Sequence, residues 1–371
     1  MKALFVFEYG GEYMMDDLMQ GVRRAVPGLQ TRLCHGLVGG YVAGGTQPVR
    51  ILNAAYMYAT LPFVMMRWRP AVVLVRTTPP GIQLWAALLG RLMNIRVGCW
   101  MMDYHPELEA RVLDRRRGAG WVARLIRGID RYLLRRMSFV IVLDDAMQAL
   151  VRSRAPAVPI VQHPTWGAVA DVTHEDAVDS GNASRGELCL AYGGNLGFAH
   201  PLETFETLIR EIQLSTRVRI VAIGASSRGE RRFAGLAERT GAVLTILPRH
   251  PFAGLGKLFA EHRVDAGVVL LSDETSGVVA PSKFSAYLRF GLPTLYIGPA
   301  RTSSQALAAR FDAGFALANG AAPADVRAAA ARLVDPAELS RTRANTRGAA
   351  EFFGSRSGTT LAAAISKFFA G

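Results

Sequence analysis

Cysteines and long apolar runs are scarce in this chain of 371 residues. The three cysteines, Cys34, Cys99 and Cys189, are far apart and lie in or near apolar runs. This spacing argues against a disulfide framework and a zinc site, and it fits a reducing cytoplasm. The first strand-like run, Ala3 to Phe7, is not preceded by a charged region and a long apolar stretch, so no signal peptide is expected.

One uncharged run, Ile51 to Met66, is sixteen residues long and contains Pro62. A membrane-spanning helix needs about twenty apolar residues, so this run is too short to span a bilayer. It is predicted to be a helix whose main role is in the core, with an interfacial role as the alternative. The Arg and Trp residues that follow it, from Arg67 to Arg69, are typical of contact at the level of lipid headgroups.

Negative charge is also sparse, with 30 acidic residues against 43 lysines and arginines, a formal net charge of +13. Such a surface favours polyanions: nucleic acid, anionic lipid or phosphorylated substrates. In the arginine-rich segment 111–136, Trp121, Leu125 and Ile129 recur every four residues. This pattern indicates either a half-buried helix with a solvated basic face or contact with an anionic membrane. No nucleic-acid partner is expected, because no recognised binding module accompanies the charge.

Short apolar runs rich in β-branched residues alternate with longer helix-like stretches along the whole chain. Nearly continuous apolar character is typical of parallel strands that helices bury on both faces. The expected strands are Ala3–Phe7, Ala71–Arg76, Arg96–Trp100, Phe139–Leu143, Val158–Val161, Leu188–Tyr192, Val218–Ile223, Val243–Leu247, Asp265–Leu270 and Pro293–Ile297. The sequence therefore predicts an α/β fold with two Rossmann-like, doubly wound parallel-sheet domains that face a cleft.

A polar interval at residues 167–187, rich in Asp, Ser, Thr and Ala, is predicted to be the linker between these domains. It separates an N-terminal domain at residues 1–166 from a C-terminal domain at residues 188–348. Residues 349–371 form a further helix-like stretch that carries four phenylalanines.

The loops that follow the strands are expected to hold the chemistry, because ligands bind at the carboxyl ends of parallel strands. Asp103, His105 and Glu107 come just after the strand Arg96–Trp100, and alternation places them on one side if the segment stays extended. Such groups can act as an acid or a base on a reacting hydroxyl. A metal site would need a further cluster of ligands, so no metal is expected.

Glycine-rich loops follow other strands. Gly193, Gly194 and Asn195 follow the strand Leu188–Tyr192 and lead toward a helix expected near His200, an arrangement that suits phosphate. A nicotinamide fingerprint is absent, because both the glycine spacing and the later acidic residue are missing.

Three further positions suit a ligand. The glycine pair Gly10 and Gly11, after the first strand, and Gly224, after another, allow a close approach of the backbone. Lys283 is a lone cation among apolar and hydroxyl residues at the start of a predicted helix, where it could pair with a diphosphate.

Taken together and in order, these segments resemble the GT-B glycosyltransferases, especially the bacterial family 4 enzymes that build envelope polysaccharides. The resemblance covers nearly the whole chain. The matching segments are Gly10-Gly11, Trp100–Glu107, His163–Trp166, Tyr192–His200 and Pro281–Pro293.

The resemblance implies that the C-terminal domain holds a nucleotide sugar, linked to UDP or GDP, without a metal or other cofactor. Diphosphate contacts would come from the glycine loop, Ser282 and Lys283, and base contacts from the region of Arg249 and His250. The N-terminal domain would bind the acceptor near Asp103, His105 or Glu107. The terminal helix would pack back onto that domain. Apart from the resemblance, the basic and apolar surface of the first domain favours a polyprenyl-diphosphate-linked saccharide as the acceptor, at the inner face of the plasma membrane, where this cytoplasmic protein would be peripherally bound. The residues expected at the donor and acceptor sites are Gly10, Gly11, Gly193, Gly194, Asn195, Gly224, Arg249, His250, Ser282, Lys283, Asp103, His105 and Glu107.

The chain departs from its relatives at three positions. Many of them carry two glutamates that correspond here to Val278 and Ala286, the second of which binds the nucleotide ribose, and a basic residue at the position of Phe198. Inverting and retaining outcomes are therefore both open: Asp103 is the base if the reaction inverts, and side chains mainly position substrates if it retains. Two alternatives share the fold, a sugar-nucleotide 2-epimerase and a catalytically silent sugar-nucleotide-binding partner.

Overall fold

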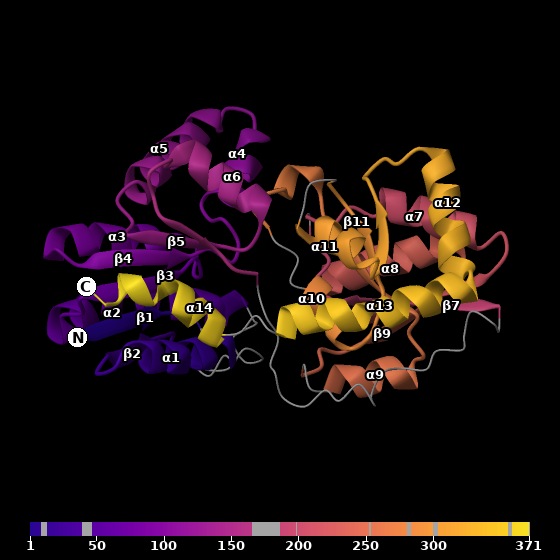
Figure 1. Ribbon diagram of the computed structural model, residues 1–371. Helices are drawn as coiled ribbons and strands as arrows, with labels where there is room; N and C mark the ends of the chain where they lie inside the picture. The colour runs from indigo at the N-terminus through magenta and orange to yellow at the C-terminus, as the bar shows by residue number, and fades with distance from the viewer. Residues whose placement is uncertain are drawn as a thin grey trace. The chain divides into compact units, whose positions relative to one another are not determined.

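The first unit of the computed structural model is built on six parallel strands (Figure 1). They are β1 (Lys2–Val6), β2 (Gln30–Cys34), β3 (Val72–Arg76), β4 (Arg96–Trp100), β5 (Phe139–Val142) and β6 (Ile160–Gln162). Their order in the sheet is β2-β1-β3-β4-β5-β6. The structure describes residues 1–8, 13–38, 47–164, 186–197, 199–251, 254–279, 283–299, 303–354 and 358–370.

Helices cover both faces of this sheet. They are α1 (Tyr13–Ala25), α2 (Gln47–Trp68), α3 (Ile82–Met93), α4 (Glu107–Asp114), α5 (Gly120–Leu134), α6 (Asp145–Arg154), α14 (Gly358–Ile365) and the 3₁₀ helix η6 (Ser366–Phe368). One core forms where α2, α3, α5 and α6 bury apolar side chains against the strands. On the other face α1 packs against α14, so the end of the chain lies beside its first helix (Figure 1). Phe368 stacks on Phe139 with 4.4 Å between ring centroids, and this contact fastens the chain terminus to β5.

The second unit contains another six-stranded parallel sheet. Its strands are β7 (Glu187–Gly193), β8 (Arg217–Ile223), β9 (Val243–Leu247), β10 (Ala266–Leu270), β11 (Thr294–Ile297) and β12 (Gly314–Leu317). Its helices are α7 (Glu203–Ile212), α8 (Ser227–Thr240), α9 (Leu255–Glu261), α10 (Lys283–Arg289), α11 (Ser303–Phe311), α12 (Pro323–Val334), α13 (Pro336–Gly354) and the 3₁₀ helix η5 (Asp273–Thr275). The sheet order β12-β11-β10-β7-β8-β9 is the doubly wound order in which the winding reverses between β7 and β10.

A short segment after η5, residues 277–280, belongs to the first unit although its neighbours in sequence belong to the second. The backbone N–H of Tyr104 donates to the carbonyl oxygen of Val278 at 2.6 Å, and Asp103 forms an antiparallel bridge with Val279. The Val278 side chain is fully buried in the core of the first unit. A carboxylate at the position of Val278 would meet this apolar core.

The predicted α/β class with two parallel sheets is confirmed, and the cleft between the domains stays a prediction. The edge strands β2 and β12 were not predicted, whereas the strands at the opposite edges, β6 and β9, were. The sequence of β2 alternates exposed and partly buried side chains before the buried Cys34 and so has no continuous apolar run. The predicted linker, up to residue 185, lies outside the described residues.

Candidate functional site

The loops at the carboxyl ends of β7 and β10 meet at the point where the winding of the second sheet reverses, which is where open α/β sheets bind ligands. β7 ends at Gly193 and Gly194 follows it, and Lys283 begins α10 after the loop that follows β10. The predicted Gly193, Gly194 and Lys283 are therefore brought together by the topology. Gly194 has φ +93°, and a Cβ atom there would lie 3.3 Å from Lys283 Cε, so a larger residue would crowd the lysine.

Lys283 is held by an aromatic residue and not by an acid. Its Nζ donates a hydrogen bond to the Tyr192 hydroxyl at 2.8 Å and lies 4.2 Å from the centroid of the Tyr192 ring. Among the residues that the structure describes, no carboxylate forms an ion pair with it. Burial lowers the pKa of Lys283 to about 7. A cation kept in this state is suited to an anionic ligand that supplies the missing negative charge.

The amides of the glycine loop are only partly available to a phosphate. Gly193 N–H donates to the Tyr287 hydroxyl at 2.7 Å, Gly194 N–H to a carbonyl of β8 at 2.7 Å, and Gly197 N–H to His200 Nδ1 at 3.2 Å. The amides of Asn195 and Leu196 have no acceptor within the described part of the chain. Within the loop, the backbone amides that remain available to a phosphate are therefore those of Asn195 and Leu196.

The loop itself is braced by α8. Ser226 caps this helix and donates to Asn195 Oδ1 at 2.6 Å. Arg232, further along α8, donates to the carbonyl oxygens of Gly197 at 2.7 Å and His200 at 2.9 Å. The expected helix after the loop begins later, because α7 starts at Glu203.

His200 is neutral at physiological pH. Burial, with Lys283 and Arg232 nearby, lowers the pKa of His200 to about 3. Since its Nδ1 accepts from Gly197, the hydrogen of the neutral ring lies on Nε2. Neither Tyr287 nor Arg232 was given a role from the sequence, because their partners lie more than 30 residues away.

The other predicted donor residues follow the neighbouring strands. Gly224 directly follows β8, and a Cβ atom there would lie 3.3 Å from Arg249, which follows β9 together with His250. Arg249 and His250 are both exposed. Gly10, Gly11 and Ser282 lie outside the described residues.

In the first unit, Asp103 and His105 lie at the carboxyl end of β4. His105 Nδ1 is 2.5 Å from a carboxylate oxygen of Glu109, one helical turn further on. Burial raises the pKa of Asp103, Glu109 raises it further, and His105 and Arg76 partly offset these effects. A carboxylate of this kind is a stronger base than an exposed aspartate. Glu109 was not predicted, although its spacing of four residues from His105 is a signal for such a pair.

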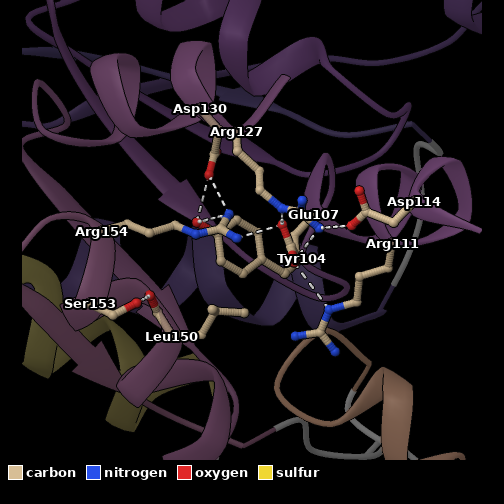
Figure 2. Close-up of polar contacts among 9 residues, drawn as sticks. All are labelled: Tyr104, Glu107, Arg111, Asp114, Arg127, Asp130, Leu150, Ser153 and Arg154. Atoms are coloured by element: carbon tan, nitrogen blue, oxygen red, sulfur yellow. Dashed lines mark hydrogen bonds and ion pairs between the residues drawn. The ribbon is translucent and has the colours of Figure 1, made fainter. Parts of the chain in front are cut away.

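The side chain of Glu107 does not join Asp103 and His105. The segment does not stay extended, because α4 begins at Glu107, and this turns its side chain into a buried network (Figure 2). Its carboxylate accepts from Arg154, from Arg127 at 2.9 Å and from Arg111 at 3.1 Å. Burial alone would raise the pKa of Glu107, but the bonds from Arg127 and Arg154 lower it overall. These contacts favour a structural role for Glu107.

The same network holds the residue between Asp103 and His105 (Figure 2). The Tyr104 hydroxyl donates to Asp130 at 2.8 Å, and Arg154 donates to Asp130 at 2.8 Å and to the Tyr104 hydroxyl at 3.3 Å. Tyr104 is fully buried. The network, with residues from α4, α5 and α6, therefore positions the loop that carries Asp103 and His105.

No group of three His, Cys, Asp or Glu side chains among the described residues could hold a metal ion. No described helix is long and apolar enough to cross a bilayer. The expectation that no metal is needed stays a prediction.

Solved structures with the same architecture cover almost the whole chain. A sucrose-phosphate synthase from Thermosynechococcus elongatus matches with TM-score 0.67 and 12% identity over 99% of this chain and 98% of its own. HepE from Anabaena, in complex with UDP-glucose, matches with TM-score 0.65 and 10% identity over 100% and 99%. WaaG, a glycosyltransferase involved in lipopolysaccharide biosynthesis, matches with TM-score 0.63 and 14% identity over 98% and 99%.

No protein-family model matches this chain, and no curated protein sequence matches it. At identities of 10–14%, these structures establish the fold. The chain has the GT-B fold of glycosyltransferases, with two sheets of six parallel strands.

Proposed function

We propose that this protein is a glycosyltransferase that moves a sugar from a nucleotide-activated donor to a hydroxyl of a lipid-linked saccharide. The main observation behind this proposal is that Lys283 is a buried cation beside Gly194 and has no carboxylate partner among the described residues. Lacking a protein counterion, it is suited to the diphosphate of a nucleotide sugar. The fold supports this proposal, since HepE of the same architecture was solved with UDP-glucose.

In the proposed reaction, the bond between the anomeric carbon and the diphosphate oxygen breaks, and a bond to the acceptor oxygen forms. Lys283 and the amides of Asn195 and Leu196 stabilise the charge that develops on the leaving diphosphate. In an inverting reaction, Asp103 takes the proton of the acceptor hydroxyl, which its raised pKa favours. Base contacts come from the region of Arg249 and His250, and no metal takes part.

The proposal that the acceptor is lipid-linked is supported by the surface formed by α2, α3 and α5 of the first unit. Exposed large hydrophobic side chains are concentrated there, five on α2, two on α3 and four on α5, whereas only five others are exposed among the described residues. Phe63 is 68% exposed, Leu92 73% and Trp121 63%. The only carboxylate on these three helices is the buried Asp130. An apolar surface whose exposed charges are all arginines fits an anionic membrane surface.

The proposed membrane contact gives a direct prediction. The protein is expected to sediment with vesicles that contain phosphatidylglycerol at low salt, and to be released at high salt, because exposed charges are screened. Arg124→Glu with Arg131→Glu, on α5, is expected to weaken binding by about 30-fold or more, given about 1 kcal/mol for each basic residue near the surface.

The matched control is Arg327→Glu with Arg347→Glu, which reverses the charge of two exposed arginines of the second unit and so changes the net charge by the same amount. Equal weakening by the two double variants would attribute the effect to net charge alone. Absence of binding at low salt would contradict the membrane contact itself.

Donor binding is tested by a thermal-shift screen over UDP-, GDP- and other sugar nucleotides. A ligand that binds the native state raises its melting temperature by mass action, so one nucleotide class is expected to stabilise the protein. A donor that stabilises the protein equally well after Lys283→Met would exclude the assigned diphosphate site. No stabilisation by any sugar nucleotide would contradict the proposed function.

Product analysis separates the alternatives. Incubation with donor alone would yield an epimer if the protein is an epimerase, whereas a transferase needs an acceptor to form product. Binding of donor with no product from any acceptor would identify a silent binding partner.

A further inference from the structure

An open groove of about 660 Å³ lies between α3 and α5 of the first unit. Its walls are formed mainly by Leu84, Trp85, Leu88, Leu125, Ile129 and Tyr132. Arg124 is the only charged residue of the lining. The groove is therefore an apolar channel in the helical layer that also carries the exposed hydrophobic side chains, and none of the residues discussed for donor or acceptor chemistry lines it.

The position of Gly128 keeps the groove open. This glycine lies in the middle of α5 and lines the groove, and a Cβ atom built on it would meet nothing within 4 Å. Glycine inside a helix is less favourable than alanine, so the helix forgoes some stability at this position. An empty space beside a helical glycine is what a ligand chain lying along α5 would require.

Charge decides between the possible occupants. The exposed charged residues of α3 and α5 are Arg91, Arg124 and Arg131, and neither helix carries an exposed carboxylate. A second copy of the chain would bring like charges together across such an interface, which disfavours self-association. A hydrocarbon chain with an anionic headgroup fits both the apolar walls and Arg124, the charged residue that lines the groove.

We infer that the groove between α3 and α5 binds the isoprenoid chain of the lipid that carries the acceptor saccharide, with its phosphate at Arg124. The inference rests on the proposed function for the identity of the lipid. A concave channel suits one chain, whereas the convex side chains such as Trp121 and Leu92 suit the bilayer surface. The lipid-linked acceptor would thus be held by its chain in the first unit.

The test uses the full-length protein and farnesyl phosphate below its micellar concentration, with binding measured by equilibrium dialysis. Saturable binding is expected, with none for inorganic phosphate. Gly128→Leu fills the groove and is expected to weaken binding by about tenfold or more. The matched control is Gly120→Leu on the same helix, where a Cβ atom also meets nothing within 4 Å but the groove is not reached. This control is expected to bind like the wild type.

A second variant, Leu88→Gln, makes the opposite wall polar and keeps the test usable if Gly128→Leu fails to fold. Unchanged binding in both groove variants would overturn the inference. So would tighter binding of lysophosphatidylglycerol than of farnesyl phosphate, which would assign the groove to membrane lipid, or a dimer that Gly128→Leu converts to a monomer. Thermal shifts with sugar nucleotides report on the second unit. If no sugar nucleotide shifts the melting temperature while farnesyl phosphate binds, the transferase proposal fails and the proposed binding of an isoprenoid chain stands. If a sugar nucleotide shifts the melting temperature while farnesyl phosphate does not bind, only the proposed role of the groove fails.

Discussion

Lys283→Ala is expected to lower the rate of sugar transfer by roughly 100- to 1,000-fold, the usual effect of removing one preorganised group that stabilises developing charge. The leaving diphosphate would lose the buried cation that lies beside Gly194. Initial rates at saturating donor and acceptor measure the effect. Lys257→Ala, which removes an exposed lysine of the same unit, is the matched control and is expected to keep the wild-type rate.

The effect of Lys283 on stability can be distinguished from its effect on the rate of transfer. Burying a cation without a counterion is costly, so Lys283→Met, which keeps much of the volume, is expected to match or raise the melting temperature while transfer is lost. A variant that melts much earlier than the wild type would point to a structural role for Lys283. Full transfer activity in either variant would refute its assignment.

The same lysine predicts a pH dependence. Because burial lowers the pKa of Lys283 to about 7, the protonated form that pairs with diphosphate is depleted as the pH rises above about 7. The profile of kcat/KM for the donor is therefore expected to fall on its alkaline side near neutral pH. Lys283→Arg is expected to move this fall to higher pH, since a guanidinium stays protonated. A fall that stays near neutral pH in the Arg variant would assign it to another group.

Arg154→Ala is expected to lower the free energy of unfolding of the first unit by about 3–5 kcal/mol, because it leaves the buried carboxylates of Glu107 and Asp130 without their shared partner. Urea denaturation followed by circular dichroism measures the change. Arg210→Ala breaks an ion pair with Glu206 in which the arginine side chain is 56% exposed, and it is expected to cost less than about 1 kcal/mol.

A neutral replacement sharpens this test. Combining Arg154→Met with Glu107→Gln removes a buried charge of each sign and is expected to recover part of the lost stability. Transfer is also expected to fall in Arg154→Ala, since Tyr104 lies between Asp103 and His105, whereas thermal shifts with donor are expected to persist. Equal destabilisation by Arg154→Ala and Arg210→Ala would show that the network is not energetically coupled.

Much of the donor site follows from local pattern. Continuous apolar runs predict buried parallel strands, and the carboxyl ends of neighbouring parallel strands share one edge of a sheet. Gly194 follows β7 and Lys283 follows the loop after β10, so the shared edge could place the two residues together although they are far apart in the sequence. The edge strand β2 escaped prediction because its exposed and partly buried side chains alternate, so it has no continuous apolar run.

The sequence by itself determined that the chain is α/β, that its sheets are parallel and that α5 has one apolar and one basic side. Only the tertiary structure decided which side of α5 faces the sheet: Ala123, Leu133 and Leu134 are buried, whereas Trp121 and Leu125 are exposed. It also decided that Glu107 joins Arg154 and that Tyr287 takes the amide of Gly193. The periodicity of apolar residues indicates that a helix has two different faces and that a strand is buried. It does not indicate which residues distant in the sequence come into contact, because tertiary packing determines those contacts.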